Sequence, residues 1–249
     1  MRAGLLAVCL FAACAAGDDR EPLVVFAASS LADAFEELER SFERAHPDVD
    51  LRLVFAGSQV LRLQIEHGAE AHVFASADAS HTDALTREGL LVGSEVFAEN
   101  ELVIITPVGE SSVHDLHSLE GAARLVIGAE SSPIGAYTRQ LFDNVARAFG
   151  PEHAARLRAN VVSQESNARL VRTKVELGEA DAAIVYRTDA RLSASVRAVP
   201  LPAALNVRAR YRVGLVRTAP PVAEAFLRLL RSAEGRSLLE RHGFLTEAL

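Results

Sequence analysis

Short apolar runs alternate with longer amphipathic segments over the first third of the chain. The apolar runs predict buried strands at residues 23–28, 51–56 and 71–77. The first intervening segment, residues 31–46, has one apolar face at helical spacing, made by Leu31, Phe35, Leu38 and Phe42. A second helix is predicted at residues 59–67. This strand–helix rhythm favours a parallel sheet covered by helices.

A second cycle of the same kind follows. Its strands are predicted at residues 101–106, 124–129, 161–162 and 182–186. Its helices are predicted at residues 133–149, from Pro151 onward, and at residues 168–177. The chain then continues with a strand at residues 210–216 and helices at residues 222–231 and 235–242.

Two such clusters, with a tail that returns to the first, predict an α/β protein of two lobes with a ligand cleft between them. The expected division assigns residues 1–21 to a signal peptide and polar tether. Residues 22–98 form the first part of lobe 1, residues 99–205 form lobe 2, and residues 206–249 return to lobe 1.

The N-terminus has the features of an export signal. Arg2 precedes an apolar stretch at residues 3–11, which is too short to span a bilayer as a helix. Phe11-Ala12-Ala13-Cys14 is similar to a lipobox, in which Cys14 would carry lipid; cleavage by an ordinary signal peptidase near residues 13–16 is the alternative. The other cysteine, Cys9, lies inside the removed segment, so the mature protein has neither disulfides nor a catalytic cysteine.

Composition and charge narrow the possible ligands. The chain has 249 residues, of which 49% are hydrophobic, so it can bury a sizeable core. Its formal net charge of −7, without a run of Lys or Arg, argues against nucleic acid as a partner. An anion could bind this acidic chain only through local attraction.

Four places offer such local attraction, because each has small or hydroxyl residues where a strand ends and a helix begins. Ser30 and Ser58 are expected to cap their helices, Ser30 together with Asp33. The amides of Ile134, which follows Pro133, and of Ala168 are expected to lack helical partners. Helix N-termini attract anions, so four of them facing one cleft would form an anion site. Plain capping is the alternative use of each serine.

The chain resembles the molybdate-binding proteins of ABC-type importers, which have the two-lobed fold of the type II periplasmic-binding-protein superfamily. The resemblance covers residues 23–244, and the segments that carry it are VFAASSLADAF, FAGSQVLRLQIEHGA, VFASADASHTDAL, PIGAY, VELGEADAAIVYRTDA and RHGF. It implies that the ligand is held by Ser30, Ser58, Ile134, Ala168 and Tyr186, with Ser29 as a further candidate.

The resemblance also implies a function. The protein would be a monomer without a cofactor that binds molybdate or tungstate and delivers it to a membrane permease. It would be exported to the periplasm and anchored to the membrane there through Cys14 if that residue is lipidated. Sulfate has the same charge and shape but is smaller, so a binding protein for sulfate or another oxyanion is the nearest alternative. A secreted hydrolase is a more distant one, because the chain lacks a G-x-S-x-G motif and a zinc-binding H-E-x-x-H motif.

Overall fold

The computed structural model describes residues 20–246, so Cys14 and the predicted signal peptide lie outside the described residues. The strands are β1 Glu21–Ala28, β2 Val49–Ala56, β3 Val73–Ser76, β4 Leu91–Pro107, β5 Leu125–Gly128, β6 Val161–Glu165, β7 Ala182–Tyr186, β8 Val196–Pro200 and β9 Arg208–Val216. The α-helices are α1 Ala32–Ala45, α2 Ser58–Glu66, α3 Ala79–Arg87, α4 Pro133–Phe149, α5 Pro151–Ala159, α6 Ala168–Glu176, α7 Arg187–Arg191, α8 Val222–Arg231 and α9 Ala233–Arg241. Two short 3₁₀ turns are η1 Ser29–Leu31 and η2 Ser118–Gly121.

The strands form one mixed sheet in the order β2-β1-β3-β9-β4-β7-β5-β6, with β8 paired to β4. Pairing is parallel among β1, β2 and β3, and again among β5, β6 and β7, as the strand–helix rhythm predicts. The expectation of a parallel sheet is wrong for β4 and β9, which run antiparallel to their neighbours and to each other. Apolar runs alone do not report strand direction, which depends on the path of the connections.

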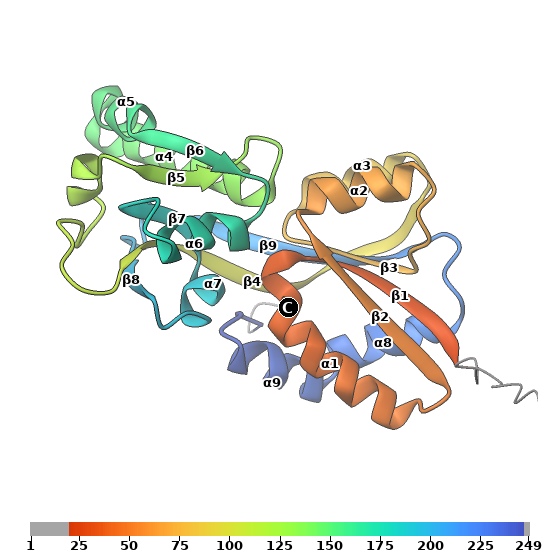
Figure 1. The fold of residues 1–249 in the computed structure, drawn as a ribbon. Helices are drawn as coiled ribbons and strands as arrows, with labels where there is room; N and C mark the ends of the chain where they lie inside the picture. The colour runs from red at the N-terminus through yellow and green to blue at the C-terminus, as the bar shows by residue number, and fades with distance from the viewer. Residues whose placement is uncertain (1–19, 247–249) are drawn as a thin grey trace, which may run out of the picture.

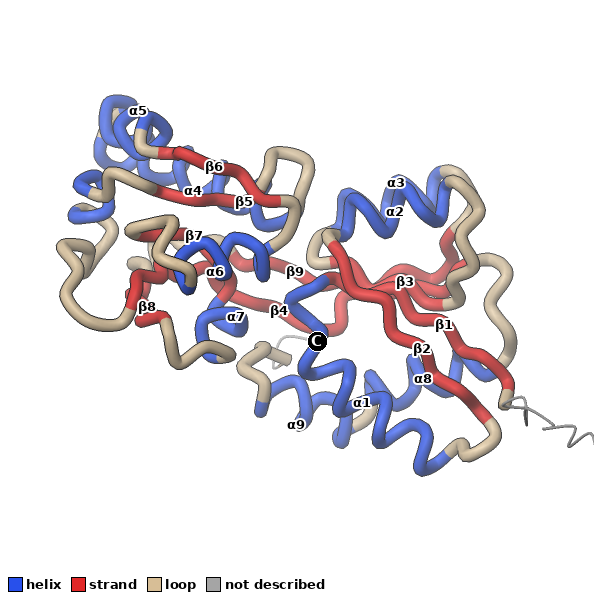
Figure 2. The backbone as a smooth tube through the Cα atoms, in the orientation of Figure 1, coloured by secondary structure: helices blue, strands red, loops and turns tan. Residues whose placement is uncertain are grey.

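The molecule has two groups of elements joined by β4 and β9 (Figure 1). We call β1–β3 with α1–α3, α8 and α9 the first lobe, and β5–β8 with α4–α7 the second lobe. Figure 2 shows helices on both sides of the strands in the first lobe. The predicted bounds at 98/99 and 205/206 fall inside β4 and just before β9, and this division remains a prediction.

Strand β4 is much longer than the predicted segment 101–106. In its first half, residues 92–96 are all exposed or half-buried, and the register shifts between Val92 and Glu95 and between Val96 and Ala98. These irregularities, together with Gly93, remove the continuous apolar run by which the second half is recognised. The predicted polar tether is also shorter than expected, because β1 already begins at Glu21, which pairs with Val49.

The first lobe is held together by the apolar face predicted for α1. Phe35 and Phe42 are buried and meet Phe226 of α8 edge to face, with ring centroids 5.9 and 5.7 Å apart. Burying one such side chain stabilises the fold by about 1.5–3 kcal/mol. Helix α8 thus packs directly on α1, and this packing supports the turn between β1 and α1. No helix among residues 20–246 is both long and apolar enough to cross a membrane.

Candidate functional site

A small cavity lies where the two lobes meet, and it contains about 210 Å³ of empty space, including solvent at its mouth. A cavity of this size suits a small ion rather than a drug-sized ligand. Its walls come from the ends of strands and the starts of helices in both lobes. The lining residues are Ala28, Ser29, Ser30, Ala56, Gly57, Ser58, Ala77, Ser132, Pro133, Ile134, Ser166, Asn167, Ala168 and Tyr186. All six candidate residues named from the sequence are among them.

The first turn of the site carries Ser29 and Ser30, but Ser30 does not cap α1 as expected. Residues Ser29–Leu31 form a 3₁₀ turn, Leu31 occupies the N-cap position, and no side chain caps the helix. Instead, the Ser30 Oγ lies 2.8 Å from the Oη of Tyr211 on β9. The expected capping role of Asp33 is also wrong, because its carboxylate pairs with Arg169 of the second lobe. Ser30 is thus held by a tertiary contact at the cavity wall.

Ser58 in the second turn is likewise not a cap. It is the first residue of α2, Gly57 is the N-cap, and no side chain caps this helix. The Ser58 Oγ accepts a hydrogen bond from the backbone N–H of Ala77 at 3.1 Å. Since one lone pair is thereby occupied, its own proton remains available to a ligand in the cavity.

Gly57 has a role that involves the opposite lobe. A Cβ atom at this position would lie 2.4 Å from the backbone oxygen of Ser166, which is far inside van der Waals contact. The Gly57 conformation, φ −64° and ψ 140°, is open to any residue. The need for glycine therefore comes from the close approach of the second lobe.

The third and fourth turns present free amides, as expected. In α4 the side chain of Ser132 accepts from the N–H of Gly135, and in α6 the side chain of Asn167 accepts from the N–H of Leu170. Neither cap engages the amide of Ile134 or of Ala168, which both lack a hydrogen-bond acceptor within residues 20–246. These N–H groups and the positive ends of both helix dipoles lie at the cavity.

Tyr186 closes the cavity from the end of β7. Its side chain is 2% exposed, and its Oη has no hydrogen-bond partner within the described chain. Burial raises the pKa of the Tyr186 hydroxyl well above its ordinary value, so the group stays protonated. A buried hydroxyl without a partner is costly and is rarely left so, and a ligand in the cavity would satisfy it.

The cavity contains no charged side chain to neutralise an anion. Among its lining residues in the described chain there is no Asp, Glu, His, Lys or Arg. A bound ion would be held by hydroxyl and amide hydrogens. This does not favour the hydrolase alternative, because within residues 20–246 the hydrogen-bond partners of Ser30 and Ser58 are Tyr211 and the Ala77 N–H, and neither is a general base.

Several contacts between described residues join the lobes around the cavity. Besides the Asp33–Arg169 pair, the Nε2 of Gln59 donates to the backbone oxygen of Ser166 at 2.7 Å. The Oη of Tyr137 donates to the backbone oxygen of Ala77 at 3.3 Å. No local sequence pattern predicts these partners, which lie far apart along the chain. They connect the two lobes at the edge of the cavity.

A buried carboxylate on α7 was also missed from the sequence. Asp189 is fully buried, and neither of its carboxylate oxygens has a hydrogen-bond partner in the part of the chain that the structure describes. Burial raises the pKa of Asp189 to about 7, although the nearby guanidinium groups of Arg172 and Arg169 oppose the shift. Its charge state therefore changes near neutral pH.

One cluster outside the cavity has residue types that bind metals. The ligand atoms of His117, Glu120 and His153 lie within 4.8 Å of one another. However, the Glu120 carboxylate already accepts from Arg156 at 2.5 Å and contacts His153. The guanidinium holds the pKa of Glu120 below its ordinary value. This cluster is an ion-pair network at the surface of the second lobe.

Comparisons with known proteins agree with this geometry. Residues 23–245 match the family model described as bacterial extracellular solute-binding protein. The molybdate-binding protein ModA of Mycobacterium tuberculosis is 34% identical over 230 residues, covering 89% of this chain and 84% of that protein. A Bacillus subtilis protein, YvgL, is named as a substrate-binding lipoprotein of an ABC transporter. It is 29% identical over 264 residues, covering 98% of this chain and 96% of its own.

A solved structure shows the same fold. The periplasmic molybdate-binding protein of Azotobacter vinelandii superposes with a TM-score of 0.76 at 17% identity, covering 90% of this chain and 98% of that one. At this identity the likeness concerns the fold, and it supports the two-lobed α/β architecture expected from the sequence.

Proposed function

The chain belongs to the family of bacterial extracellular solute-binding proteins, and we propose that it captures molybdate and delivers it to the permease of an ABC importer. The family consists of solute-binding transport proteins rather than enzymes. The ligand set proposed here is Ser30, Ser58, Ile134, Ala168 and Tyr186, with Ser29 as an auxiliary contact.

The observation that carries this proposal is the set of hydrogen-bond donors around the cavity. Two amides without acceptors, two serine hydroxyls and the unpartnered hydroxyl of Tyr186 face a small space without carboxylates. Molybdate is a dianion at neutral pH and carries no proton, so it requires donors only. Charge-assisted hydrogen bonds of this kind are about twice as strong as neutral ones, which allows binding without Lys or Arg.

Tungstate has the same charge and geometry, and we propose that it binds as well. Sulfate also lacks a proton but is smaller, so the walls of the cavity would have to reject it by size. Phosphate keeps a proton near neutral pH and needs an acceptor, which this set of donors does not provide.

Calorimetric titration of the mature protein with molybdate, tungstate, sulfate and phosphate tests the proposal. We expect molybdate and tungstate to bind and sulfate and phosphate to bind far more weakly. Equal binding of sulfate would reassign the protein to another oxyanion. If none of the four anions binds, the proposed function is wrong.

The location of the protein follows from its family, which is extracellular. We propose that Cys14 carries lipid and anchors a monomeric protein beside its permease, as the name of the B. subtilis relative suggests. Stable anchoring requires more than one acyl chain, which a fully lipidated Cys14 would supply. Because the Cys14→Ser variant lacks the residue that carries lipid, it should leave the membrane fraction. Wild-type protein that is already soluble would favour ordinary signal cleavage.

A further inference from the structure

Behind Ser30, polar side chains continue from the cavity into the two strands that join the lobes. The Ser30 Oγ lies 2.8 Å from the Oη of Tyr211 on β9. On the far side of Tyr211, the amide nitrogen of Asn100 on β4 lies 3.5 Å from the same Oη. Tyr211 and Asn100 are both fully buried, so these contacts are shielded from water.

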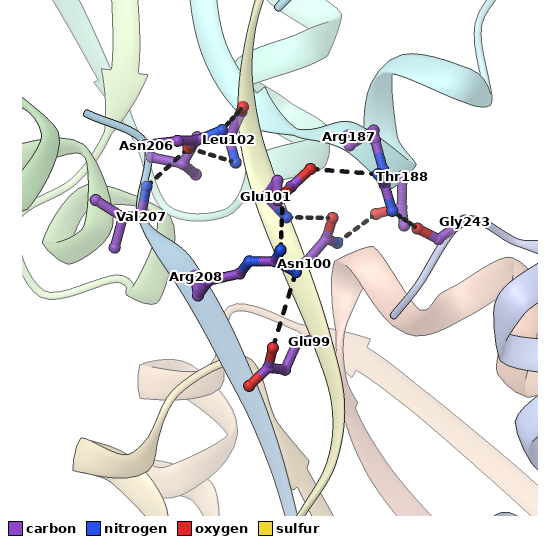
Figure 3. Close-up of polar contacts among 10 residues, drawn as sticks. All are labelled: Glu99, Asn100, Glu101, Leu102, Arg187, Thr188, Asn206, Val207, Arg208 and Gly243. Carbon is purple, nitrogen blue, oxygen red and sulfur yellow. Dashed lines mark hydrogen bonds and ion pairs between the residues drawn. The ribbon is translucent and has the colours of Figure 1, made fainter. Parts of the chain in front are cut away.

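The orientation of the Asn100 amide is fixed by its neighbours. Its Oδ1 accepts from the backbone N–H of Glu101 at 3.0 Å, and its Nδ2 donates to the Oγ1 of Thr188 at 2.9 Å (Figure 3). If the amide were reversed, the Asn100 Nδ2 would face the backbone N–H of Glu101, and two donors cannot form a hydrogen bond. The second hydrogen of Nδ2 therefore points to Tyr211, and Asn100 offers Tyr211 no acceptor.

This orientation gives the chain of hydrogen bonds a direction. In the described chain the Tyr211 hydroxyl has two hydrogen-bond partners, the Asn100 Nδ2 and the Ser30 Oγ, and of these only the serine can accept its proton. Burial keeps that phenol protonated by raising its pKa well above the ordinary value. Since the Ser30 Oγ accepts from Tyr211, the Ser30 proton must point elsewhere, and the cavity is the open direction.

We propose that Tyr211 and Asn100 are positioning residues that fix Ser30 as a hydrogen-bond donor, so that the site selects fully deprotonated oxyanions. The inference rests on the proposed oxyanion-binding function and extends it to residues outside the cavity. Ser58 is held in the same sense by the N–H of Ala77. We call the chain of hydrogen bonds from Asn100 through Tyr211 to Ser30 the relay. Because of it, Ser30 is not an acceptor for the proton of hydrogen phosphate.

Tyr211→Phe removes the donor to Ser30 and retains the ring. The serine hydroxyl then regains about three staggered orientations and loses the polarisation from Tyr211. We expect the affinity for molybdate to fall about 3- to 10-fold and the molybdate-to-phosphate affinity ratio to fall with it. The molybdate-to-sulfate ratio should stay constant, because neither anion carries a proton.

Asn100→Asp should reverse the relay. The new carboxylate would accept the Tyr211 proton, the Tyr211 oxygen would accept the Ser30 proton, and Ser30 would present lone pairs to the cavity. At pH 8 we expect the molybdate-to-phosphate ratio to fall by more than about tenfold, the effect of losing one hydrogen bond to a charged group.

Asn206→Asp is the matched control, because it adds the same charge beside the same strands. Asn206 exchanges hydrogen bonds with the backbone of Leu102 at 3.2 and 3.0 Å and accepts from the N–H of Val207, without touching Tyr211 or Ser30 (Figure 3). Its affinity ratios should match the wild type. If Asn206→Asp lowers the molybdate-to-phosphate affinity ratio as much as Asn100→Asp does, the added charge alone explains the effect and the relay is refuted.

The measurements are calorimetric titrations of folded variants with molybdate, sulfate and phosphate. An unchanged molybdate-to-phosphate ratio in Tyr211→Phe overturns the relay; if that variant does not fold, an unchanged ratio in Asn100→Asp does so. A wild-type protein that binds no oxyanion would instead refute the proposed function, so the two failures are distinguishable.

Discussion

The close approach of the two lobes at Gly57 predicts that a larger side chain at this position weakens molybdate binding. In Gly57→Ala the new Cβ would lie 2.4 Å from the Ser166 oxygen, whereas ordinary contact begins at 3.4 Å. The second lobe must therefore move away by about 1 Å. Hydrogen bonds to the anion span about 2.7–3.2 Å, so a shift of this size would take the amides of Ile134 and Ala168 out of range. Two such bonds, at about 1.5–3 kcal/mol each, correspond to an affinity loss of roughly 100-fold or more.

The folded state without ligand should tolerate this change, since the Gly57 backbone conformation suits alanine. Calorimetry with molybdate gives the affinity, and melting temperatures with and without molybdate separate binding from folding. Gly121→Ala is the control, because a Cβ there meets no atom within 4 Å, and it should bind like the wild type. A folded Gly57→Ala protein with wild-type affinity would refute the argument that closure of the lobes brings the donors together.

Three further predictions concern single side chains. Ser30→Ala and Ser58→Ala should each lower molybdate affinity about 10- to 100-fold in calorimetry; Ser58→Ala should also lower the melting temperature, because the buried Ala77 amide loses its acceptor. Normal binding by both would show that the site is misplaced. Asp33→Asn breaks a half-exposed ion pair worth about 0–1 kcal/mol, so titration should show less than about a fivefold loss that shrinks at high salt; a larger, salt-independent loss would contradict this. Burial raises the folded-state pKa of Asp189 from 3.8 to about 7, so its protonated form stabilises the fold at low pH, and this contribution is lost as the pH rises to about 7. Asp189→Asn should therefore raise the melting temperature at pH 8 but hardly at pH 4.5, and equal changes at both would argue against the shift.

Much of the fold could be predicted because its signals are local. The apolar face of α1 and the short strands of each lobe repeat at spacings that a reader of the sequence can recognise. Helix starts are equally local, which is why the free amides of Ile134 and Ala168 were correctly expected. The first half of β4 was missed because its register shifts and polar positions interrupt the alternation.

The roles of several polar residues could not be predicted, because their partners are distant in the chain. Ser30 and Ser58 are predicted to cap helices, yet neither occupies an N-cap position and their hydroxyls bond to Tyr211 and Ala77. The local pattern predicts that Asp33 caps a helix together with Ser30, whereas its carboxylate pairs with Arg169 across the lobes. A side chain bonds to whichever group the fold brings nearest, and a local pattern does not contain that information.

The sequence by itself determined which residues could form an anion site. Four helix starts with small residues and one tyrosine at a strand end can each be recognised from a short stretch of sequence. Only the tertiary structure decided that these donors meet in one cavity. It also decided that the hydroxyls are held by groups behind them and that, among residues 20–246, no carboxylate lines the cavity. The physical reason is that hydrogen-bond direction and the exclusion of charge depend on distances between segments, which are set when β4 and β9 join the two lobes in one sheet.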